Sequence, residues 1–392
     1  MKPLQILQPR VGDVCALPAF EEALKAAAEN AEDVDRKGRF PKEAIDALKN
    51  AGALGWFVPA GGDVRLEQLA QATFELSRRC SASGMVFAMH HIQVASLVRH
   101  GGDSAWMRSY LDRLIDEQRL IASATSEVGV GGAMRRSIAG LEKDGDGFRF
   151  EKKASTISYG AHADDVLTTM RRSPEADAGD QVLVLTHFED MDREPMGEWD
   201  TLGMRGTCSP GFVIRGKCLP DQVLPVPFAT IAAETMVPVS HVLWGHVWLG
   251  IATEAFDRAQ AFVRVQARQN PGVTPPTAAK LAELSVMMHQ FRALVTTALS
   301  DYVKLLDAQN FAHLSSVGYA VRINNFKVAA SEMLVDLCQG ALRICGFLGY
   351  KNGGPYSVGR QLRDAHSAAL MIANDRILAT NASLLTVYRD TL

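Results

Sequence analysis

The spacing of apolar residues changes twice along this chain, and that change most limits the folds open to it. From Phe20 to about Leu120 apolar residues recur at steps of three and four, as in "FEEALKAAAENAEDVDRKGRF", which predicts helices that end at Gly or Pro. Between about Ile121 and Phe228 the pattern shortens to runs of β character separated by Gly, Asp and Pro. The helical period then returns and lasts to the C-terminus.

Three segments follow from this pattern: an N-terminal helical domain (residues 1–120), a middle β domain (121–228) and a C-terminal helical bundle (229–392). The β runs "FRFEKKASTISYG", "DDVLTTMRR", "QVLVLTHF" and "GFVIRGKCLP" are short, as in a small sandwich or barrel. Long periodic stretches follow, the first ending at "NPGVTPP", where each Pro resists helical continuation. The last stretch, from Gly359 to Asp390, is interpreted as one helix. We therefore expect a mainly α fold with a central β domain and a C-terminal four-helix bundle.

Composition excludes several classes of protein. A net charge of −3 on 392 residues gives no sign of a nucleic-acid-binding surface. No apolar run reaches the ~20 residues of a membrane span, and the N-terminus lacks an apolar signal core. The six cysteines are scattered without CxxC pairs, and no His cluster has metal-ligand spacing. We expect a cytoplasmic protein with no disulfide, no metal, and no nucleic-acid or membrane partner.

One loop stands out within this frame. "ATSEVGVGGAMRRS", residues 124–137, places the hydroxyls of Thr125 and Ser126 beside three glycines, of which Gly131 is the second. Glycine permits close backbone approach, and hydroxyls can donate to or accept from a planar heteroaromatic ligand. The loop lacks both the strand–GxGxxG–helix context of a dinucleotide fold and the Lys of a phosphate loop.

Three further motifs follow in order: "KASTISYGAHADD", "WDTLGMRGTCSPGFVIRGKCLPDQVL" and "LRICGFLGYKNGGPYSVGRQLRD". With the first loop they resemble the acyl-CoA dehydrogenase family of flavoproteins over nearly the whole chain, from roughly Phe20 to Leu385. The corresponding family motifs read A-x-T-E-P-x-x-G-S, G-x-K-x-x-I-T-N-G-x-x-A-D, L-G-x-R-x-S/T, and G-G-x-G-Y before an R-D helix.

The resemblance implies a bound flavin, FAD in preference to FMN. Ser126 matches the residue that contacts the flavin pyrimidine edge, and Ser158 matches the residue that contacts flavin N5. Thr156 matches a position beside the ring. Arg268 matches an Arg that reaches the FAD pyrophosphate of a neighbouring subunit, and "GFLGY", from Gly346 through Gly349 to Tyr350, matches a stretch that contacts another protomer's FAD. The family is usually tetrameric and sometimes dimeric, so we expect a homotetramer or homodimer.

The catalytic carboxylate of the family is missing from both of its usual positions. Counting nine residues on from Arg363 gives Ile372, and counting back from Leu249-Gly250 gives Ser240. Two histidines lie near these positions: His241 follows Ser240, and His366 lies on the last helix. Either could act as a base near neutral pH, and His241, His366 and Ser240 are the candidate catalytic residues.

Other polar residues carry weaker expectations. Glu127 matches a structural loop glutamate, Glu234 is expected to cap its helix, and Asp364 is expected in an ion pair or a structural role near the cofactor. Asn374 and Asp375 would face the site only if the last helix is continuous. The pair Arg135-Arg136 could meet a phosphate or an acidic carrier protein.

Three interpretations remain. The first is a flavin oxidoreductase that oxidises an acyl thioester, on CoA or on an acyl carrier protein, with a non-standard base and an electron-transfer partner. Met85 and Met89 would suit its acyl pocket. The second is a flavin-dependent monooxygenase on the same fold that uses O₂, with Ser158 near N5 and His366 on a C-terminal helix. The third is a non-catalytic flavoprotein.

Overall fold

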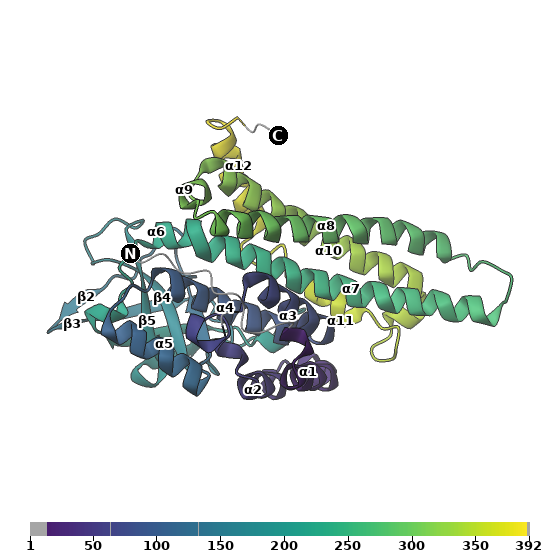
Figure 1. Cartoon of the computed structure of the whole chain (residues 1–392), viewed down its shortest axis with the longest axis horizontal. Coiled ribbons are helices and arrows are strands. Elements are labelled where there is room, and N and C mark those ends of the chain that lie inside the picture. Colours follow the sequence, from purple (N-terminus) through teal and green to yellow (C-terminus); the bar gives the residue numbers. More distant parts are fainter. Residues whose placement is uncertain (1–13, 63, 132, 390–392) are drawn as a thin grey trace.

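The computed structural model describes residues 14–62, 64–131 and 133–389. Three long helices run along its longest axis, the N-terminal helices pack along one side of them, and the strands gather at one end (Figure 1). A single hydrophobic core continues through all three parts. The expected order of helical, β and helical segments is confirmed, and none of the described helices is long and apolar enough to cross a membrane.

The N-terminal part consists of five helices: α1 (Pro18–Lys37), α2 (Lys42–Asn50), α3 (Leu66–Arg79), α4 (Ser81–His100) and α5 (Ala105–Glu117). Helix α1 begins with proline, whose missing N–H needs no helical partner there, and ends at Gly38 in the left-handed conformation (φ 61°). Ser104 caps α5, since its Oγ accepts a hydrogen bond of 3.1 Å from the Met107 N–H. Helix α4 is buried around most of its circumference because α3, α7 and strand β1 enclose it.

The middle part holds seven strands: β1 (Ile121–Ala124), β2 (Glu142–Asp144), β3 (Gly147–Ala154), β4 (Asp165–Arg171), β5 (Gln181–His187), β6 (Asp192–Met196) and β7 (Gly211–Cys218). They form a three-stranded sheet in the order β1-β4-β5 and a four-stranded sheet in the order β2-β3-β7-β6. In the first sheet β1 runs parallel to β4, with Ala122 opposite Val166, and β5 runs antiparallel. Strands β4 and β5 are buried on both faces, which explains why neither shows a strict alternation of apolar and polar residues.

The C-terminal part contains α6 (Phe228–Ile231), α7 (Val237–Gln269), α8 (Ala278–Asp307), α9 (Phe311–Leu314), α10 (Val317–Tyr350), α11 (Gly359–Ala365) and α12 (Asn374–Leu385). Helices α7, α8 and α10 pack against one another, and α12 packs on α10. A π-helical turn, Ala232–Met236, leads into α7. Glu234 lies within this turn and does not cap the helix as expected, since α7 has no side-chain cap and the Glu234 carboxylate accepts a hydrogen bond of 3.3 Å from Ser315.

The expectation of one continuous last helix is wrong. Helix α11 ends at Ala365, residues 366–373 form successive turns, and α12 begins at Asn374. Ile372 adopts a left-handed backbone conformation with φ 52°, which is costly for a β-branched residue. His366 is therefore the first residue after α11, not part of the last helix, and the predicted fourth helix of the bundle is two short ones.

Candidate active site

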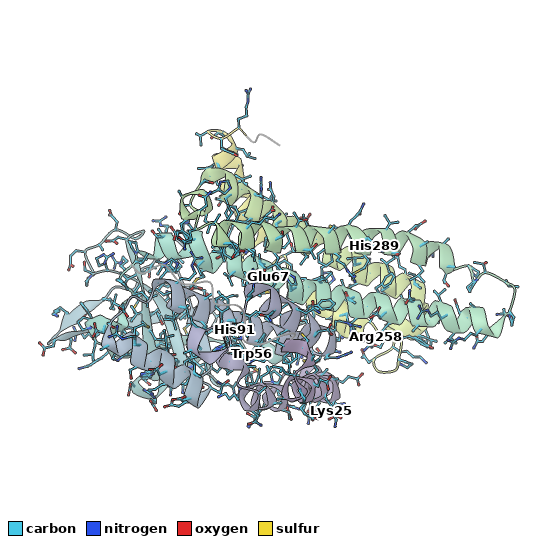
Figure 2. All side chains as sticks on the ribbon, viewed as in Figure 1. Lys25, Trp56, Glu67, His91, Arg258 and His289 are labelled. Atoms are coloured by element: carbon cyan, nitrogen blue, oxygen red, sulfur yellow. The ribbon has the colours of Figure 1, made fainter. Side chains whose placement is uncertain are left out.

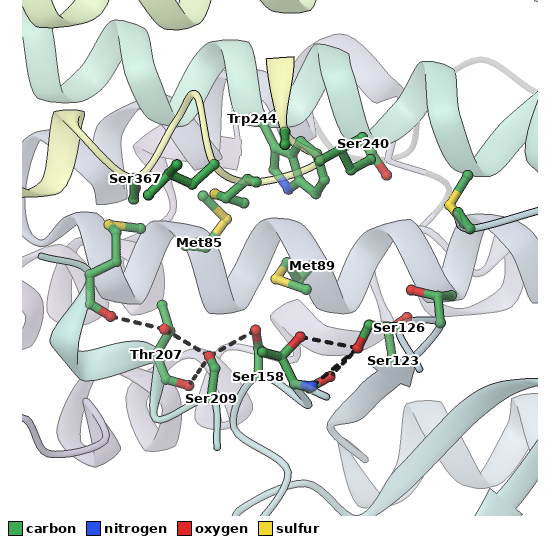
Figure 3. Close-up of a pocket in the computed structure, with 18 of the residues that line it drawn as sticks. Met85, Met89, Ser123, Ser126, Ser158, Thr207, Ser209, Ser240, Trp244 and Ser367 are labelled. Carbon is green, nitrogen blue, oxygen red and sulfur yellow. Dashed lines mark hydrogen bonds between the residues drawn. The ribbon is translucent and has the colours of Figure 1, made fainter. Parts of the chain in front are cut away.

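A cavity of about 600 Å³ lies where the three parts of the chain meet. Its walls are the loops that follow β1 and β3, the segment before β7, one face each of α4 and α7, and the turns between α11 and α12. The volume is in the range of sites for cofactors and drug-sized molecules. Figure 3 shows hydroxyl groups along the strand side of this cavity and sulfur and indole groups along the helix side.

The strand side carries the hydroxyls predicted to meet a flavin. Ser126 Oγ lies 3.1 Å from Thr156 Oγ1 and accepts from the Thr156 backbone N–H, so the two loops are joined. Ser158 Oγ accepts a hydrogen bond of 2.9 Å from Ser209 Oγ, whose own position is fixed 2.9 Å from Thr207 Oγ1 (Figure 3). Because Ser158 accepts from Ser209, its own proton is free to donate to a ligand in the cavity.

Glu127 anchors the glycine-rich loop through hydrogen bonds. Its carboxylate is buried and accepts from Ser137 Oγ (2.7 Å), the Ile138 N–H (3.1 Å) and the Ala139 N–H (2.7 Å). Lys152 Nζ lies 3.5 Å from it, and burial lowers the pKa of this lysine to about 8. Glu127 therefore has the structural role expected of it. Thr125 lines the cavity, whereas Gly131 (φ 62°) is exposed beside it, between the lining residues Val130 and Ala133.

The segment before β7 is held close to α11. A Cβ atom on Gly203 would collide with the carbonyl group of Arg363, so this contact requires glycine. Asp364 is buried and accepts from Ser81 and from the Met204 N–H at 2.6 Å, and burial raises its pKa. Its role is structural, because these bonds tie α11 to α4 and to the loop.

The helix side is mostly apolar. Met85, Met89 and Gln93 follow at steps of four on α4, so they share one face, and all three line the cavity. The neighbouring His90 and His91 do not: each ring nitrogen Nε2 bonds a backbone carbonyl, at Leu54 and Ala53 respectively. Gln93 was missed from the sequence, although it lies one turn beyond the two methionines.

The three predicted catalytic residues are placed differently. His366 lines the cavity and is exposed. Ser240 also lines it, but its Oγ donates to the Met236 carbonyl oxygen at 2.5 Å. His241 is buried and is not among the lining residues; burial first, and the charge of Lys327 second, lower its pKa to about 3. Of the two candidate bases, only His366 therefore reaches the cavity.

None of the described cavity-lining residues is a carboxylate. Ile372, at the first position where a catalytic glutamate was sought, presents an apolar side chain to the cavity. The charged groups on its wall are guanidinium groups: Arg363, which pairs with Asp35, and Arg376, which is exposed opposite Gly131. Asn374 is buried and bonded to Lys327, Asp375 is exposed, and Arg135 and Arg136 are exposed at the edge of the loop.

Arg268, Gly346 and Gly349 are not among the residues that line the cavity. Arg268 follows Ser240 by 28 residues on α7, which is about 42 Å of helix. The Val358 N–H bonds the Gly349 carbonyl, and the carbonyl of the adjacent Ser357 accepts from Arg258, also on the distal half of α7. Gly349 therefore lies beside the start of α11 and the distal half of α7, where Figure 2 labels Arg258.

Comparison with known proteins identifies the family. The sequence model of the acyl-CoA dehydrogenase N-terminal domain matches residues 19–118, and that of the C-terminal domain matches residues 232–374, together more than half of the chain. The chain belongs to the acyl-CoA dehydrogenase superfamily. Family membership indicates a flavin-dependent enzyme.

Its relatives include proteins named as acyl-CoA dehydrogenases and proteins named as monooxygenases. The chain is 23% identical to the probable acyl-CoA dehydrogenase YngJ of Bacillus subtilis, with 88% of this chain and 89% of that protein covered. It is 24% identical to L-evernosamine nitrososynthase of a Micromonospora species, covering 87% and 82%. Among solved structures, FMN-bound TdsC from Paenibacillus sp. A11-2 superposes with a TM-score of 0.79 at 20% identity, covering 95% of this chain and 98% of that one.

Proposed function

We propose that this member of the acyl-CoA dehydrogenase superfamily is a flavin-dependent monooxygenase that uses reduced flavin and O₂ on a small, largely apolar molecule. The observation that carries the proposal is the absence of a carboxylate from the described lining of the cavity. Oxidation of an acyl thioester needs a base for the α-proton, and family members supply a carboxylate whose pKa burial can adjust. Oxygen transfer from reduced flavin has no such requirement.

The residues on the strand side fit a flavin. Ser126, Thr156 and Ser158 present hydroxyls from two loops that are already joined by hydrogen bonds, so little ordering is needed when a ring system binds. When bound, the flavin supplies the redox chemistry. Ser158 would hold its polar edge by donating its free proton, and the methionine and tryptophan side chains opposite would exclude water from the reacting face.

We propose that this flavin is FAD or FMN, and that contacts from a second protomer determine which of the two binds. Arg268 lies about 42 Å of helix from Ser240, so it could contact only the cofactor of another protomer. The exposed apolar side chains Phe347, Leu348 and Tyr350 at that end of α10 support a subunit interface there. In a homotetramer or homodimer, the C-terminal end of α10 from one protomer could cover the adenine half of a flavin bound in another protomer. Such an arrangement would favour FAD over FMN.

One observation supports the other chemistry. His366 lines the cavity and could take the place of the missing glutamate as a proton acceptor for an acyl thioester, on CoA or on a carrier protein. In that case electrons would leave through an electron-transfer partner. Oxygen would not be a substrate.

An isotope experiment tests the proposal. The protein is loaded with FMN or FAD, reduced chemically, and mixed with ¹⁸O-labelled O₂ and a panel of small apolar aromatic and sulfur compounds. We expect one labelled oxygen atom in the product by mass spectrometry. In a parallel anaerobic arm, oxidised enzyme is mixed with acyl-CoA thioesters, and we expect no loss of flavin absorbance. Bleaching in that arm without any label incorporation would overturn the monooxygenase proposal and support thioester oxidation with His366.

A further inference from the structure

Two residues on the helix side of the cavity each carry a buried polar atom that has no hydrogen-bond partner among the described residues. The atoms are Oε1 of Gln93 and Nε1 of Trp244, whose residues are 2% and 7% exposed. Other buried polar atoms of the described chain also lack partners, but Gln93 and Trp244 are the two such residues that line the cavity. Since an unpaired buried polar atom is costly, the two atoms together point to a ligand that completes them.

Gln93 offers an acceptor. Its Nε2 donates to the Met89 carbonyl oxygen at 3.3 Å, which orients the amide and leaves Oε1 as the unpaired end. The residue lies on the same face of α4 as Met85 and Met89, so its amide is the polar group in a stripe of sulfur and hydrocarbon. An acceptor in such surroundings selects for a donor on the ligand.

Trp244 offers a donor, since an indole N–H can only donate. Its ring stacks on His241, with centroids 5.9 Å apart, and extends from α7 into the space above Met89 (Figure 3). Burial keeps His241 uncharged, because it lowers the pKa of that ring to about 3. The ring is therefore held by a neutral neighbour, and its N–H has no hydrogen-bond partner among the described residues.

We propose that Gln93 and Trp244 recognise one uncharged group that both donates and accepts a hydrogen bond, a hydroxyl being the simplest, on an otherwise apolar substrate. The residues that α4 and α7 contribute to the cavity carry no charge, so an ionised group would find no counter-charge on this side. Met85 and Met89 pack around the rest of the molecule and adapt to its shape. This inference rests on the proposed function only in taking the cavity as the substrate site.

A matched pair of probes tests the inference. 4-Ethylphenol and ethylbenzene differ by one hydroxyl, and their binding to the flavin-loaded protein is measured by isothermal titration calorimetry. We expect 4-ethylphenol to bind roughly tenfold tighter than ethylbenzene. Trp244→Phe and Gln93→Met keep the bulk of each side chain, and each should reduce this preference to about threefold or less without changing the affinity for ethylbenzene.

Trp248→Phe is the control. Trp248 also lies on α7, is buried and has an unpaired indole nitrogen, but it does not line the cavity. This variant should keep the wild-type preference. Equal affinity for the two probes, no binding of either, or a preference that survives both Trp244→Phe and Gln93→Met would overturn the inference. If one variant no longer binds ethylbenzene, the substitution has collapsed its cavity. The hydroxyl preference of the other variant then tests the inference.

The readout separates this inference from the proposed function. Binding is measured without turnover, so a failure to incorporate labelled oxygen leaves the hydroxyl preference measurable. Conversely, label incorporation with no hydroxyl preference would retain the monooxygenase and remove only the roles given to Gln93 and Trp244.

Discussion

The ammonium group of Lys327 donates a hydrogen bond of 2.7 Å to the carbonyl oxygen of Ile372, 45 residues further along the chain. It also donates to Asn374 Oδ1 at 2.7 Å, and Asn374 in turn donates to Ser331 on the same helix as the lysine. Lys327 is fully buried. A left-handed Ile costs on the order of 1–3 kcal/mol and persists only where its surroundings impose it. Lys327 and Asn374 thus fix the break that turns Ile372 toward the cavity.

The protonation of Lys327 gives the first prediction. Burial lowers its pKa from 10.5 to about 8. Between pH 8 and 10.5 the unfolded chain therefore holds a proton here that the folded chain has lost, so the contribution of this lysine to the unfolding free energy rises with pH. We expect the wild type to gain up to about 3 kcal/mol relative to Lys327→Met across this window. Urea unfolding of both proteins at pH 7.5 and 10 checks this; parallel pH profiles would contradict it.

The same contact explains why the sequence led to the wrong last helix. The segment from His366 to Ala373, "HSAALMIA", contains neither Gly nor Pro and consists largely of good helix formers. Local propensity therefore favours continuation, and a bond from a helix 45 residues earlier overrides it. Lys327 itself gave no signal, because one lysine in an amphipathic helix is ordinary.

Other features of the site were predictable because they are local. The segments at β4 and β5 are short and rich in β-branched and apolar residues, and the glycines and hydroxyls of the first loop lie together in sequence, so their positions followed from pattern and resemblance. Gln93 and Trp244 are different. Each lies in a buried helix where it is typical of a packed core, and only the shared cavity reveals that their polar atoms lack partners.

The anchor of the glycine-rich loop gives the second prediction. Glu127→Gln replaces one carboxylate oxygen with an amide N–H donor that faces the Ser137 or Ala139 donors, and it leaves Lys152 without a counter-charge. Breaking a buried ion pair on one side typically costs about 3–5 kcal/mol. We expect a lower thermal midpoint and weaker flavin binding, measured by differential scanning calorimetry and flavin fluorescence. Glu142→Gln, at an exposed glutamate in β2, should change neither; equal effects of the two substitutions would refute the anchoring role.

The hydroxyl chain on the strand side gives the third prediction. Ser158→Ala removes the proposed donor to the flavin and should weaken FMN and FAD binding about tenfold, the worth of about 1.4 kcal/mol. Ser209→Ala removes the hydroxyl that donates to Ser158 and leaves Ser158 itself in place, so its effect should be smaller. Because the two act as one unit, the double variant should be no weaker than Ser158→Ala alone. Titration of flavin fluorescence measures all three, with Ser123→Ala as a control hydroxyl in the same cavity. Additive losses would mean that Ser209 acts independently of Ser158.

The far end of the bundle gives the last prediction, which concerns the proposed second protomer. Arg268 is exposed and lies about 42 Å of helix from Ser240, so it can meet a flavin cofactor only in another chain. If it pairs with the pyrophosphate there, Arg268→Glu replaces attraction by repulsion and should weaken FAD binding by at least tenfold. FMN, which lacks the adenylate half, should be affected less.

Arg264→Glu makes the same charge change one turn earlier, at another exposed arginine of α7, and should leave the FAD affinity unchanged. Light scattering during the titration reports the oligomeric state of the wild type and of the variant. An oligomeric Arg268→Glu protein with wild-type FAD affinity would show that this arginine does not contact the cofactor, whereas a monomeric one with lost affinity would place it in the interface.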